Sequence, residues 1–453
     1  MIELGEQQRE AIDKITTFCR DNNYTEDNIA FSLTGSAGTG KSTCLSYLIE
    51  TLTDINITLC ALTHKASIIL TYVTGKEAFT LHKVLSLSPN LSLEKLNLKN
   101  LRFYQNNAPT LIPYRGLLII DEASMINDNL YKLLLELCME YECKILYVSD
   151  SKQLQPVRNN GLSLVYKCKN KYELTQIFRQ NEKNSLIQVL NYLRERPIFK
   201  SEWLTGNNGY DNEYGKFVIE RNRDRFIQTC YNIINRNENS KILCYTNNMV
   251  RFYNEKLKSM LYVLDDTNPY PQGCLLTGYS NVKEQKGFGE YQILNGADYK
   301  IITSEPATKP YIYGVNRIML SGYKLLLKEI NGSSTDLKSV FLLDENNDYE
   351  TIANWIEKER NEAVLSKRWQ IYYRLTEAFC SFIDINLPDG RTVKVKNFDY
   401  GYAQTVHRSQ GSTYDNVMID MNDLYTCRKL EELRQLQYVG LSRTKKDIYM
   451  YLC

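Results

Sequence analysis

The fold is decided by the stretch Gly35-Ser36-Ala37-Gly38-Thr39-Gly40-Lys41-Ser42-Thr43. It fits the pattern G-x-x-x-x-G-K-[ST] and follows an apolar run at 29–33, which predicts a strand, a glycine-rich loop and a helix. Glycines let successive backbone N–H groups turn toward phosphate oxygens, and the helix adds the positive end of its dipole. We expect all nine residues to bind a nucleotide, with Lys41 on the β and γ phosphates and the Ser42 hydroxyl on Mg²⁺.

A second strand end carries two adjacent acids. The apolar run 117–120 leads directly into Asp121 and Glu122. Asp121 is expected to complete the Mg²⁺ shell opposite Ser42, and Glu122 to polarise the water that attacks the γ phosphate. An acidic pair alone is as often a solvated turn or a helix cap. Together with the phosphate loop, the pair predicts a nucleoside triphosphatase whose metal is Mg²⁺.

The surrounding pattern predicts an α/β fold. Four short apolar runs alternate with helical stretches before residue 180, as in a parallel sheet with helices on both faces. These runs are 29–33, 58–62, 116–120 and 144–148. Ligands in such sheets bind beyond the carboxyl ends of the strands. Further strands are expected at 241–245 and 447–452. Residues 275–400 instead contain β-like pieces with turn dipeptides and one charged helix, 350–379, which indicates an insertion.

Composition excludes several classes of protein. The chain has 453 residues, 43% of them hydrophobic and 24% charged, which is typical of a multidomain globular protein. No apolar run approaches the roughly 18 residues of a membrane span, and the N-terminus does not resemble a leader peptide. The twelve cysteines are scattered without a C-x-x-C pair, so we expect free thiols in a cytoplasmic protein. Because the net charge is only +2, any contact with nucleic acid is expected to come from a local groove and not from an overall positive charge.

The segment 148–157, Val-Ser-Asp-Ser-Lys-Gln-Leu-Gln-Pro-Val, resembles motif III of the superfamily 1 helicases. In that family the glutamine, here Gln153, senses the γ phosphate. Serine stands at 149 where the family usually has glycine, which affects only a tight turn. The resemblance implies two RecA-like motor domains and an ATP-driven motor on nucleic acid.

Other segments resemble the motifs of this family in the right order. Gln8 in 6–11 would read adenine, Arg179 in 174–180 and Arg443 in 438–444 would reach the γ phosphate, and Gln410 and Gly411 in 403–411 would join nucleotide to nucleic acid. Segments 61–66, 79–82, 244–248 and 403–411 resemble strand-contacting motifs, although Leu62 replaces a usual proline. The resemblance implies that nine residues bind the strand: Thr63, His64, Thr80, His82, Thr246, Asn247, Thr405, His407 and Ser409.

The resemblance is closest to the B branch, the Dda-type and RecD-like helicases, in a phage-like form. It implies movement from 5′ to 3′ and four parts: domain 1A (1–82 and 114–183), a β-hairpin pin 1B (83–113), domain 2A (184–274 and 401–453) and an SH3-like insertion 2B (275–400). Phe103 and Tyr104 would act as wedge residues that separate the strands. Packing of these aromatics onto their own domain is an equal alternative.

The expected function is an ATP-dependent DNA helicase with Mg²⁺, working on single-stranded DNA and on junctions of single- and double-stranded DNA. We expect a monomer in the cytoplasm, or in the host cytoplasm if a phage encodes it, acting with replication or recombination proteins. Three alternatives stay open: an RNA helicase or RNA-stimulated ATPase, a translocase that does not separate strands, and a small-molecule kinase. The last needs neither the Gln153 segment nor a second motor domain.

Overall fold

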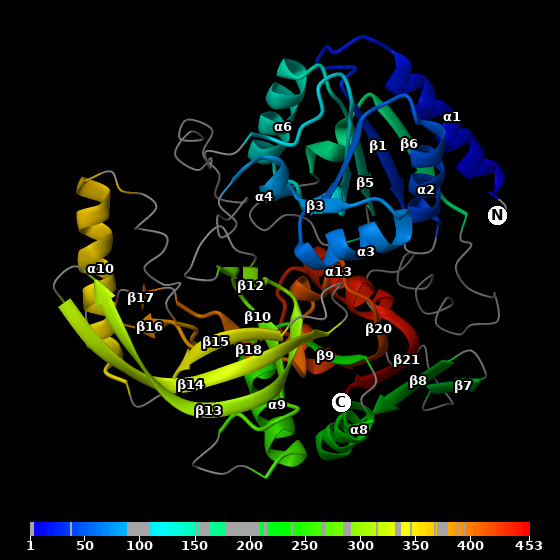
Figure 1. The fold of residues 1–453 in the computed structure, drawn as a ribbon. Helices are drawn as coiled ribbons and strands as arrows, with labels where there is room; N and C mark the ends of the chain where they lie inside the picture. Colours follow the sequence, from blue (N-terminus) through cyan, green and yellow to red (C-terminus); the bar gives the residue numbers. More distant parts are fainter. Residues whose placement is uncertain are drawn as a thin grey trace. The chain divides into compact units, whose positions relative to one another are not determined.

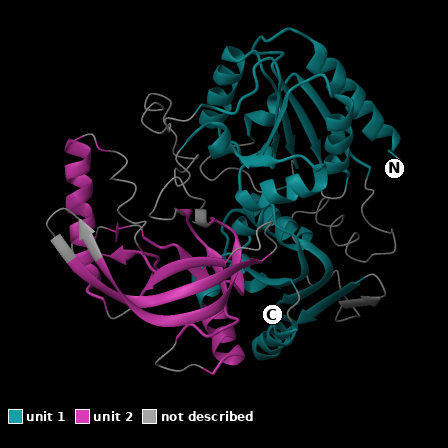
Figure 2. Cartoon of the chain, viewed as in Figure 1, with its two compact units in different colours: residues 1–251, 404–453 teal, residues 252–403 magenta. Residues whose placement is uncertain are grey.

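The computed structural model describes residues 4–36, 39–87, 109–150, 153, 163–176, 209–212, 215–236, 239–263, 269–283, 291–313, 316–330, 337–344, 347–366, 368, 379–386, 390, 392–393 and 395–453. The chain divides into two compact units, which Figure 2 shows in different colours. Unit 1 comprises residues 1–251 and 404–453, and unit 2 comprises residues 252–403. Two six-stranded sheets lie in unit 1, and a five-stranded sheet lies in unit 2.

The first sheet is parallel (Figure 1), and the phosphate loop follows the carboxyl end of its strand β1. Its strands, in spatial order, are β3 (Ala78–Thr80), β2 (Ile57–Ala61), β4 (Leu117–Asp121), β5 (Lys144–Ser149), β1 (Ala30–Gly35) and β6 (Asn170–Leu174). Its helices are α1 (Glu6–Arg20), α2 (Lys41–Thr51), α3 (His64–Thr74), α4 (Leu81–Val84) and α6 (Asp128–Glu140). The four strands predicted before residue 150 are confirmed, each within about two residues of its predicted ends.

Both faces of this sheet are buried, which explains why its strands are continuous apolar runs. Along β4, Leu118 and Ile120 pack into one core, while Leu117 and Ile119 pack into the core on the opposite face. Successive side chains of a strand point to opposite faces, so a strand covered on both sides needs apolar residues at every position. The sheet therefore holds the ends of β1, β4 and β5 in a fixed order for the loops that follow them.

The second sheet of unit 1 has the same α/β character. Its strands, in spatial order, are β19 (Ala403–Thr405), β9 (Ser240–Cys244), β20 (Tyr414–Asp420), β21 (Thr444–Tyr451), β8 (Gly215–Glu220) and β7 (Gly209–Asn212). Neighbours from β9 to β8 are parallel, and β7 is antiparallel. The helices are α8 (Arg223–Asn235), α9 (Asn247–Leu261), α12 (Met421–Leu424) and α13 (Leu430–Ser442). The strands predicted at 241–245 and 447–452 are confirmed as β9 and β21.

Unit 2 is built on an antiparallel sheet, with the order β15 (Leu337–Leu343), β14 (Asn316–Ile330), β13 (Asp298–Tyr313), β10 (Leu275–Gly278) and β18 (Phe398–Tyr400). Short strands pair beside it: β11 (Val282–Lys283) with β12 (Tyr291–Ile293), and β16 (Ile385–Asn386) with β17 (Thr392–Val393). Unit 2 extends beyond the predicted insertion, 275–400, at both ends. Its likeness to an SH3 fold and the four-part division of the chain stay predictions.

The predicted helix 350–379 ends earlier than expected. The helix α10 spans Tyr349–Leu365, and its first turn is capped by the Asp348 carboxylate, which accepts the N–H of Thr351. The N–H of Arg368 donates to the carbonyl of Ala363, five residues back, a bond that is typical of a helix C-terminus. Phe379 lies outside any helix and is buried in the core of unit 2. The predicted end was therefore wrong.

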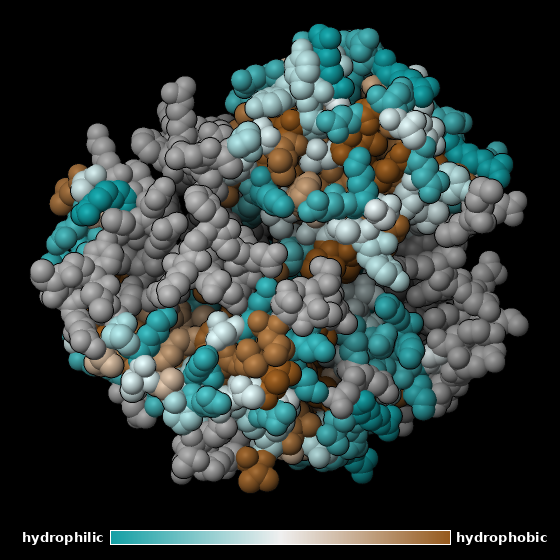
Figure 3. Space-filling model, viewed as in Figure 1, coloured by the Kyte–Doolittle hydropathy of each residue, from teal (hydrophilic) through white to brown (hydrophobic). Residues whose placement is uncertain are grey.

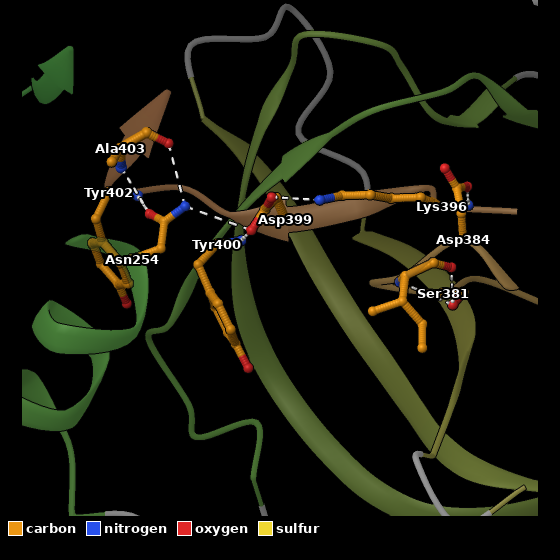
Figure 4. A network of polar contacts seen from close by, with 9 residues as sticks. Asn254, Ser381, Asp384, Lys396, Asp399, Tyr400, Tyr402 and Ala403 are labelled. Carbon is orange, nitrogen blue, oxygen red and sulfur yellow. Dashed lines mark hydrogen bonds and ion pairs between the residues drawn. The ribbon is translucent and has the colours of Figure 1, made fainter. Parts of the chain in front are cut away.

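A polar network holds together the two places where unit 2 begins and ends in sequence (Figure 4). The buried side chain of Asn254, on α9, accepts the N–H groups of Tyr402 and Ala403 at 3.1 and 2.8 Å. Its amide donates to the Ala403 carbonyl at 3.3 Å and to Asp399 at 3.5 Å. Lys396 binds the second oxygen of Asp399 at 2.6 Å. One asparagine therefore joins the outgoing helix to the returning strand.

The surface and the cysteines agree with the composition. On the face shown in Figure 3, apolar residues form separate small patches among hydrophilic ones. No helix in the described part of the chain is both long and apolar enough to cross a membrane. All twelve cysteines are free thiols, and ten of them are buried, where a thiol packs as a small apolar side chain.

Candidate functional site

The phosphate loop begins where β1 ends and closes onto the first turn of α2. A Cβ atom at Gly35 would lie 2.5 Å from the Thr39 hydroxyl oxygen and 3.0 Å from the Leu174 carbonyl oxygen, so a larger residue would have to displace one of them. Gly40 has a φ of 81°, in the left-handed region that glycine adopts without strain, and it caps α2. The Lys41 ammonium donates to the carbonyls of Gly35 and Ser36 at 2.5 and 3.1 Å. The loop thus holds the lysine head over its own backbone.

The N-terminus of α1 is bound to this loop through Gln8. The buried Gln8 side chain accepts the N–H of Gly5 at 2.9 Å and donates to the Thr39 carbonyl at 3.4 Å. Its neighbour Gln7 reaches the opposite way, and its side-chain oxygen accepts the N–H groups of Thr175 and Gln176, both at 3.0 Å. The two glutamines therefore connect the phosphate loop to the segment that leads toward position 179. The role of Gln7 is absent from the sequence prediction.

The two acids at the end of β4 lie in the electrostatic field of the phosphate loop. Asp121 accepts the N–H of Glu122 at 2.9 Å, and Glu122 has a φ of 55°, which is strained for a residue with a side chain. Burial raises the pKa of Glu122 to about 7, and the charge of Asp121 acts in the same direction. Burial also raises the pKa of Asp121. The Lys41 charge opposes both shifts, which indicates that the three side chains are near one another.

These side chains fit a magnesium ion. Asp121 ends one parallel strand, and Ser42 lies exposed in the first turn of α2, beyond the same edge of the sheet. Among the described residues, no group of three or more His, Cys, Asp or Glu side chains could hold a metal by itself. A hydroxyl and one carboxylate suit Mg²⁺, because this ion keeps several waters and takes its remaining ligands from phosphates.

Arg443 directly follows α13, a helix of the second sheet. Its guanidinium donates to the Val439 carbonyl at 3.2 Å and to the Ser442 hydroxyl at 3.1 Å, and the side chain is buried. The Arg443 charge lowers the pKa of Glu122, against the effect of burial. The structure therefore brings this predicted arginine within electrostatic reach of the predicted catalytic acid.

Two predicted strand-contacting threonines of the first sheet begin helices. Thr63 caps α3 by accepting the N–H of Ala66 at 3.2 Å, and Thr80 caps α4 by accepting the N–H of Lys83 at 3.3 Å. Each hydroxyl keeps its own proton for another acceptor. The half-buried His64 is the first residue of α3, and burial lowers its pKa. The half-buried His82 lies in α4.

The corresponding loop of the second sheet is held by Asp423, a residue that the sequence prediction missed. Its carboxylate accepts the N–H groups of Tyr245 and Thr246 at 2.6 and 2.8 Å, and the Thr246 hydroxyl at 2.7 Å. The Thr246 oxygen also accepts the N–H of Met249 at 3.3 Å. Because the hydroxyl proton is bound to Asp423, Thr246 positions the loop, and the exposed Asn247 is left to face solvent.

The predicted motif at 403–411 is mostly buried. The hydroxyl of Ser409 is fully buried and donates to the Val406 carbonyl at 2.7 Å. It therefore supports the turn, whereas the sequence predicted a contact with the nucleic-acid strand. The Thr405 hydroxyl accepts the N–H of Arg408 at 3.4 Å. His407 lies 3.6 Å from Glu432, and burial lowers its pKa while Glu432 opposes that shift.

The end of this motif approaches the first sheet. A Cβ atom at Gly411, which has a φ of 70°, would lie 3.1 Å from the Cβ of Ala66 on α3. The Lys65 ammonium lies 4.8 Å from the centre of the Tyr414 ring. Gln410 is buried beside Gly411. Motif segments of the two sheets are therefore in contact within unit 1.

Several predicted site residues lie outside the described residues: Ala37, Gly38, Phe103, Tyr104 and Arg179. Thr43 is half-buried in the first turn of α2. Gln153 is described and buried, and its N–H donates to the Asp150 carbonyl at 3.2 Å.

Comparisons with known proteins agree with these motifs. A family model described as an AAA domain matches residues 3–204, and one described as a UvrD-like helicase C-terminal domain matches residues 400–451. The ATP-dependent DNA helicase dda of Enterobacteria phage T4 is 24% identical over 453 residues, which cover 92% of this chain and 93% of that protein. The ATP-dependent RecD2 DNA helicase of Deinococcus radiodurans is 37% identical over 166 residues, or 36% of this chain and 21% of that protein.

A solved structure shows the same fold. The Pif1 helicase from Candida albicans is 17% identical, with a TM-score of 0.52 over 100% of this chain and 95% of that chain. The fold is therefore α/β with two RecA-like motor domains, one on each six-stranded sheet.

Proposed function

The chain belongs to the superfamily 1 helicases of the B branch, and on that premise we propose an ATP-dependent DNA helicase that moves 5′ to 3′ on single-stranded DNA. Membership makes the protein an enzyme of the hydrolase class. The proposal includes separation of duplex strands at junctions, action as a monomer in the cytoplasm, and work in replication or recombination.

One arrangement supports the proposal: motif segments of the two sheets meet at Gly411 and Ala66. Lys41 at the start of α2 and Arg443 after α13 both lower the pKa of the buried Glu122. Negative charge builds up on the γ phosphoryl group during transfer, and a guanidinium neutralises it with a planar pair of donors. Such an arginine raises the rate by about 10³ to 10⁵ in related enzymes. We assign Arg443 this role, together with Arg179. Glu122 would orient and deprotonate the attacking water.

Ser42 and Asp121 would hold Mg²⁺, which neutralises phosphate charge when bound. Lys41 and the backbone N–H groups of the loop would bind the β and γ phosphates, and Gln153 would sense the γ phosphate. Gln8 would orient the loop through Thr39 as well as facing the base.

Movement follows if the strand contacts of the two motor domains alternate. ATP would favour the arrangement in which Arg443 of the second domain approaches the acids of the first, and product release would favour the open one. Thr63, His64, Thr80 and His82 would bind the strand on the first domain, and Asn247, Thr405 and His407 on the second. Each closure would then become one step along the strand. Phe103 and Tyr104 stay the proposed wedge.

The test is steady-state ATP hydrolysis without polymer and with single-stranded DNA, single-stranded RNA or duplex DNA, each at low and high salt. We expect single-stranded DNA to stimulate turnover most, and the stimulation to weaken with salt because phosphate contacts release counterions. Substrates with a 5′ or a 3′ tail then test polarity, and only the 5′ tail should support unwinding. Preference for RNA would move the assignment to an RNA helicase. No stimulation by any polymer would contradict the motor.

A further inference from the structure

We infer that Tyr438 is a positioning residue for ATP hydrolysis: its hydroxyl holds helix α13, which ends directly before Arg443, against the segment that carries Gln153. This inference rests on the proposed function. It adds a contact to which the resemblance assigned no role, since only Arg443 was given one in the segment 438–444.

The contact is a buried hydrogen bond to a carboxylate. The Tyr438 hydroxyl donates to Oδ2 of Asp150 at 3.0 Å, and the two side chains are 2% and 1% exposed. Hydrogen bonds to charged acceptors are about twice as strong as neutral ones, and water cannot replace them readily at a buried position. The bond is therefore strong enough to fix the position of one element relative to the other.

On one side, Asp150 is part of the turn that presents Gln153. Asp150 follows β5 directly, and its carbonyl accepts the N–H of Gln153 and the hydroxyl of Tyr166, both at 3.2 Å. The backbone of Asp150 thus shapes the Gln153 turn while its side chain binds Tyr438. A shift of this turn would be transmitted directly to α13.

On the other side, Tyr438 lies five residues before Arg443. Arg443 is held to the last turn of α13 through the Val439 carbonyl, so its position follows that of the helix. The charge of Arg443 already acts on Glu122. A rotation or displacement of α13 that breaks the Tyr438 bond would therefore move Arg443 relative to the catalytic acid.

The test compares two tyrosine variants. Tyr438→Phe removes the hydroxyl and keeps the ring. The matched control is Tyr147→Phe, because Tyr147 is a fully buried tyrosine of β5 whose hydroxyl has no hydrogen-bond partner among the described residues. Both variants are assayed for ATP hydrolysis over a range of ATP concentrations with saturating single-stranded DNA.

We expect Tyr438→Phe to lower kcat about tenfold, equivalent to about 1.4 kcal/mol in the barrier, while KM for ATP changes less than about twofold. Tyr147→Phe should leave both constants at their wild-type values. In an Asp150→Ala background, which lacks the acceptor, adding Tyr438→Phe should cost much less than tenfold, because the two residues act through one bond. Thermal unfolding of each variant separates loss of rate from loss of folded protein.

Equal kcat values for Tyr438→Phe and Tyr147→Phe would overturn the inference. It would also be overturned if the effects of the Tyr438 and Asp150 substitutions on kcat simply added in the double variant, because the two residues would then act independently. If single-stranded DNA did not stimulate ATP hydrolysis by the wild-type protein, the proposed function itself would be wrong.

Discussion

Asp423 binds Thr246 twice, through the hydroxyl group at 2.7 Å and through the backbone N–H at 2.8 Å. The acid comes from the short helix α12 after β20, and the threonine from the end of the neighbouring strand β9. The loop that precedes α9 is therefore held in shape before any nucleic acid binds it. Preorganisation of this kind lowers the ordering cost of binding.

Asp423→Asn is expected to weaken strand binding. An amide group would place an NH₂ donor against backbone N–H donors, so at least one of the three hydrogen bonds is lost. The concentration of single-stranded DNA that half-saturates ATP turnover should rise about tenfold, in line with a lost hydrogen bond to a charged group. The value of kcat at saturating DNA should stay unchanged.

Thr246→Ser is the matched control for Asp423→Asn, because serine keeps the hydroxyl that donates to the acid. It should bind DNA within about threefold of wild type, as fits a retained hydrogen bond. If Asp423→Asn were half-saturated at the same concentration of single-stranded DNA as the wild type, the hydrogen bonds of Asp423 would not contribute to DNA binding.

The phosphate loop and the acid should separate binding from turnover. Lys41→Ala removes the ammonium that lies over the loop, so binding of a fluorescent ATP analogue should be lost. Glu122→Gln keeps the size of the side chain but not its basicity, so it should bind the analogue normally and hydrolyse ATP at least about 100-fold more slowly. Near-normal hydrolysis by Glu122→Gln would remove Glu122 from the catalytic role.

The backbone at Glu122 gives a prediction about stability. Its φ of 55° costs a residue with a Cβ atom about 1–2 kcal/mol, whereas glycine adopts this conformation freely. Glu122→Gly should therefore be more stable to chemical unfolding than Glu122→Ala by about 1 kcal/mol. The reverse order would mean that this turn is not strained in solution.

Gln8 is expected to affect ATP affinity through the loop. Gln8→Glu keeps the oxygen that accepts the Gly5 N–H but loses the donor to the Thr39 carbonyl, and two oxygens then face each other. KM for ATP should rise by about tenfold, as expected for an unpaired buried carbonyl. The half-buried Gln7 offers a comparison: Gln7→Glu keeps its acceptor for Thr175 and Gln176 and should leave KM for ATP near wild type.

Much of the first motor domain could be predicted because its motifs are local. The phosphate loop and the acid pair each follow a buried apolar strand, so the strand pattern also placed the chemistry at one edge of the sheet. The residues that hold these motifs could not be predicted in this way. Asp423 and Tyr438 act on partners 177 and 288 residues away in sequence, and no spacing rule connects such positions.

Burial also changed the expected role of some motif residues. A hydroxyl group in a strand-contacting motif looks the same in sequence whether it faces solvent or its own turn. The structure turns Ser409 inward and commits the proton of Thr246 to Asp423. The end of α10 could not be predicted because charged residues continue in the sequence beyond Arg368, whose N–H closes the helix by donating to Ala363.

The hydrogen bonds of Asn254 have a consequence for how the residues of unit 2 can be exchanged. Because the departing helix and the returning strand are joined at one side chain, residues between them enter and leave the second motor domain at a single point. A segment attached at one point is gained, lost or exchanged in one genetic event while the strand order of the host sheet is preserved. We therefore expect that unit 2 can be exchanged as one module.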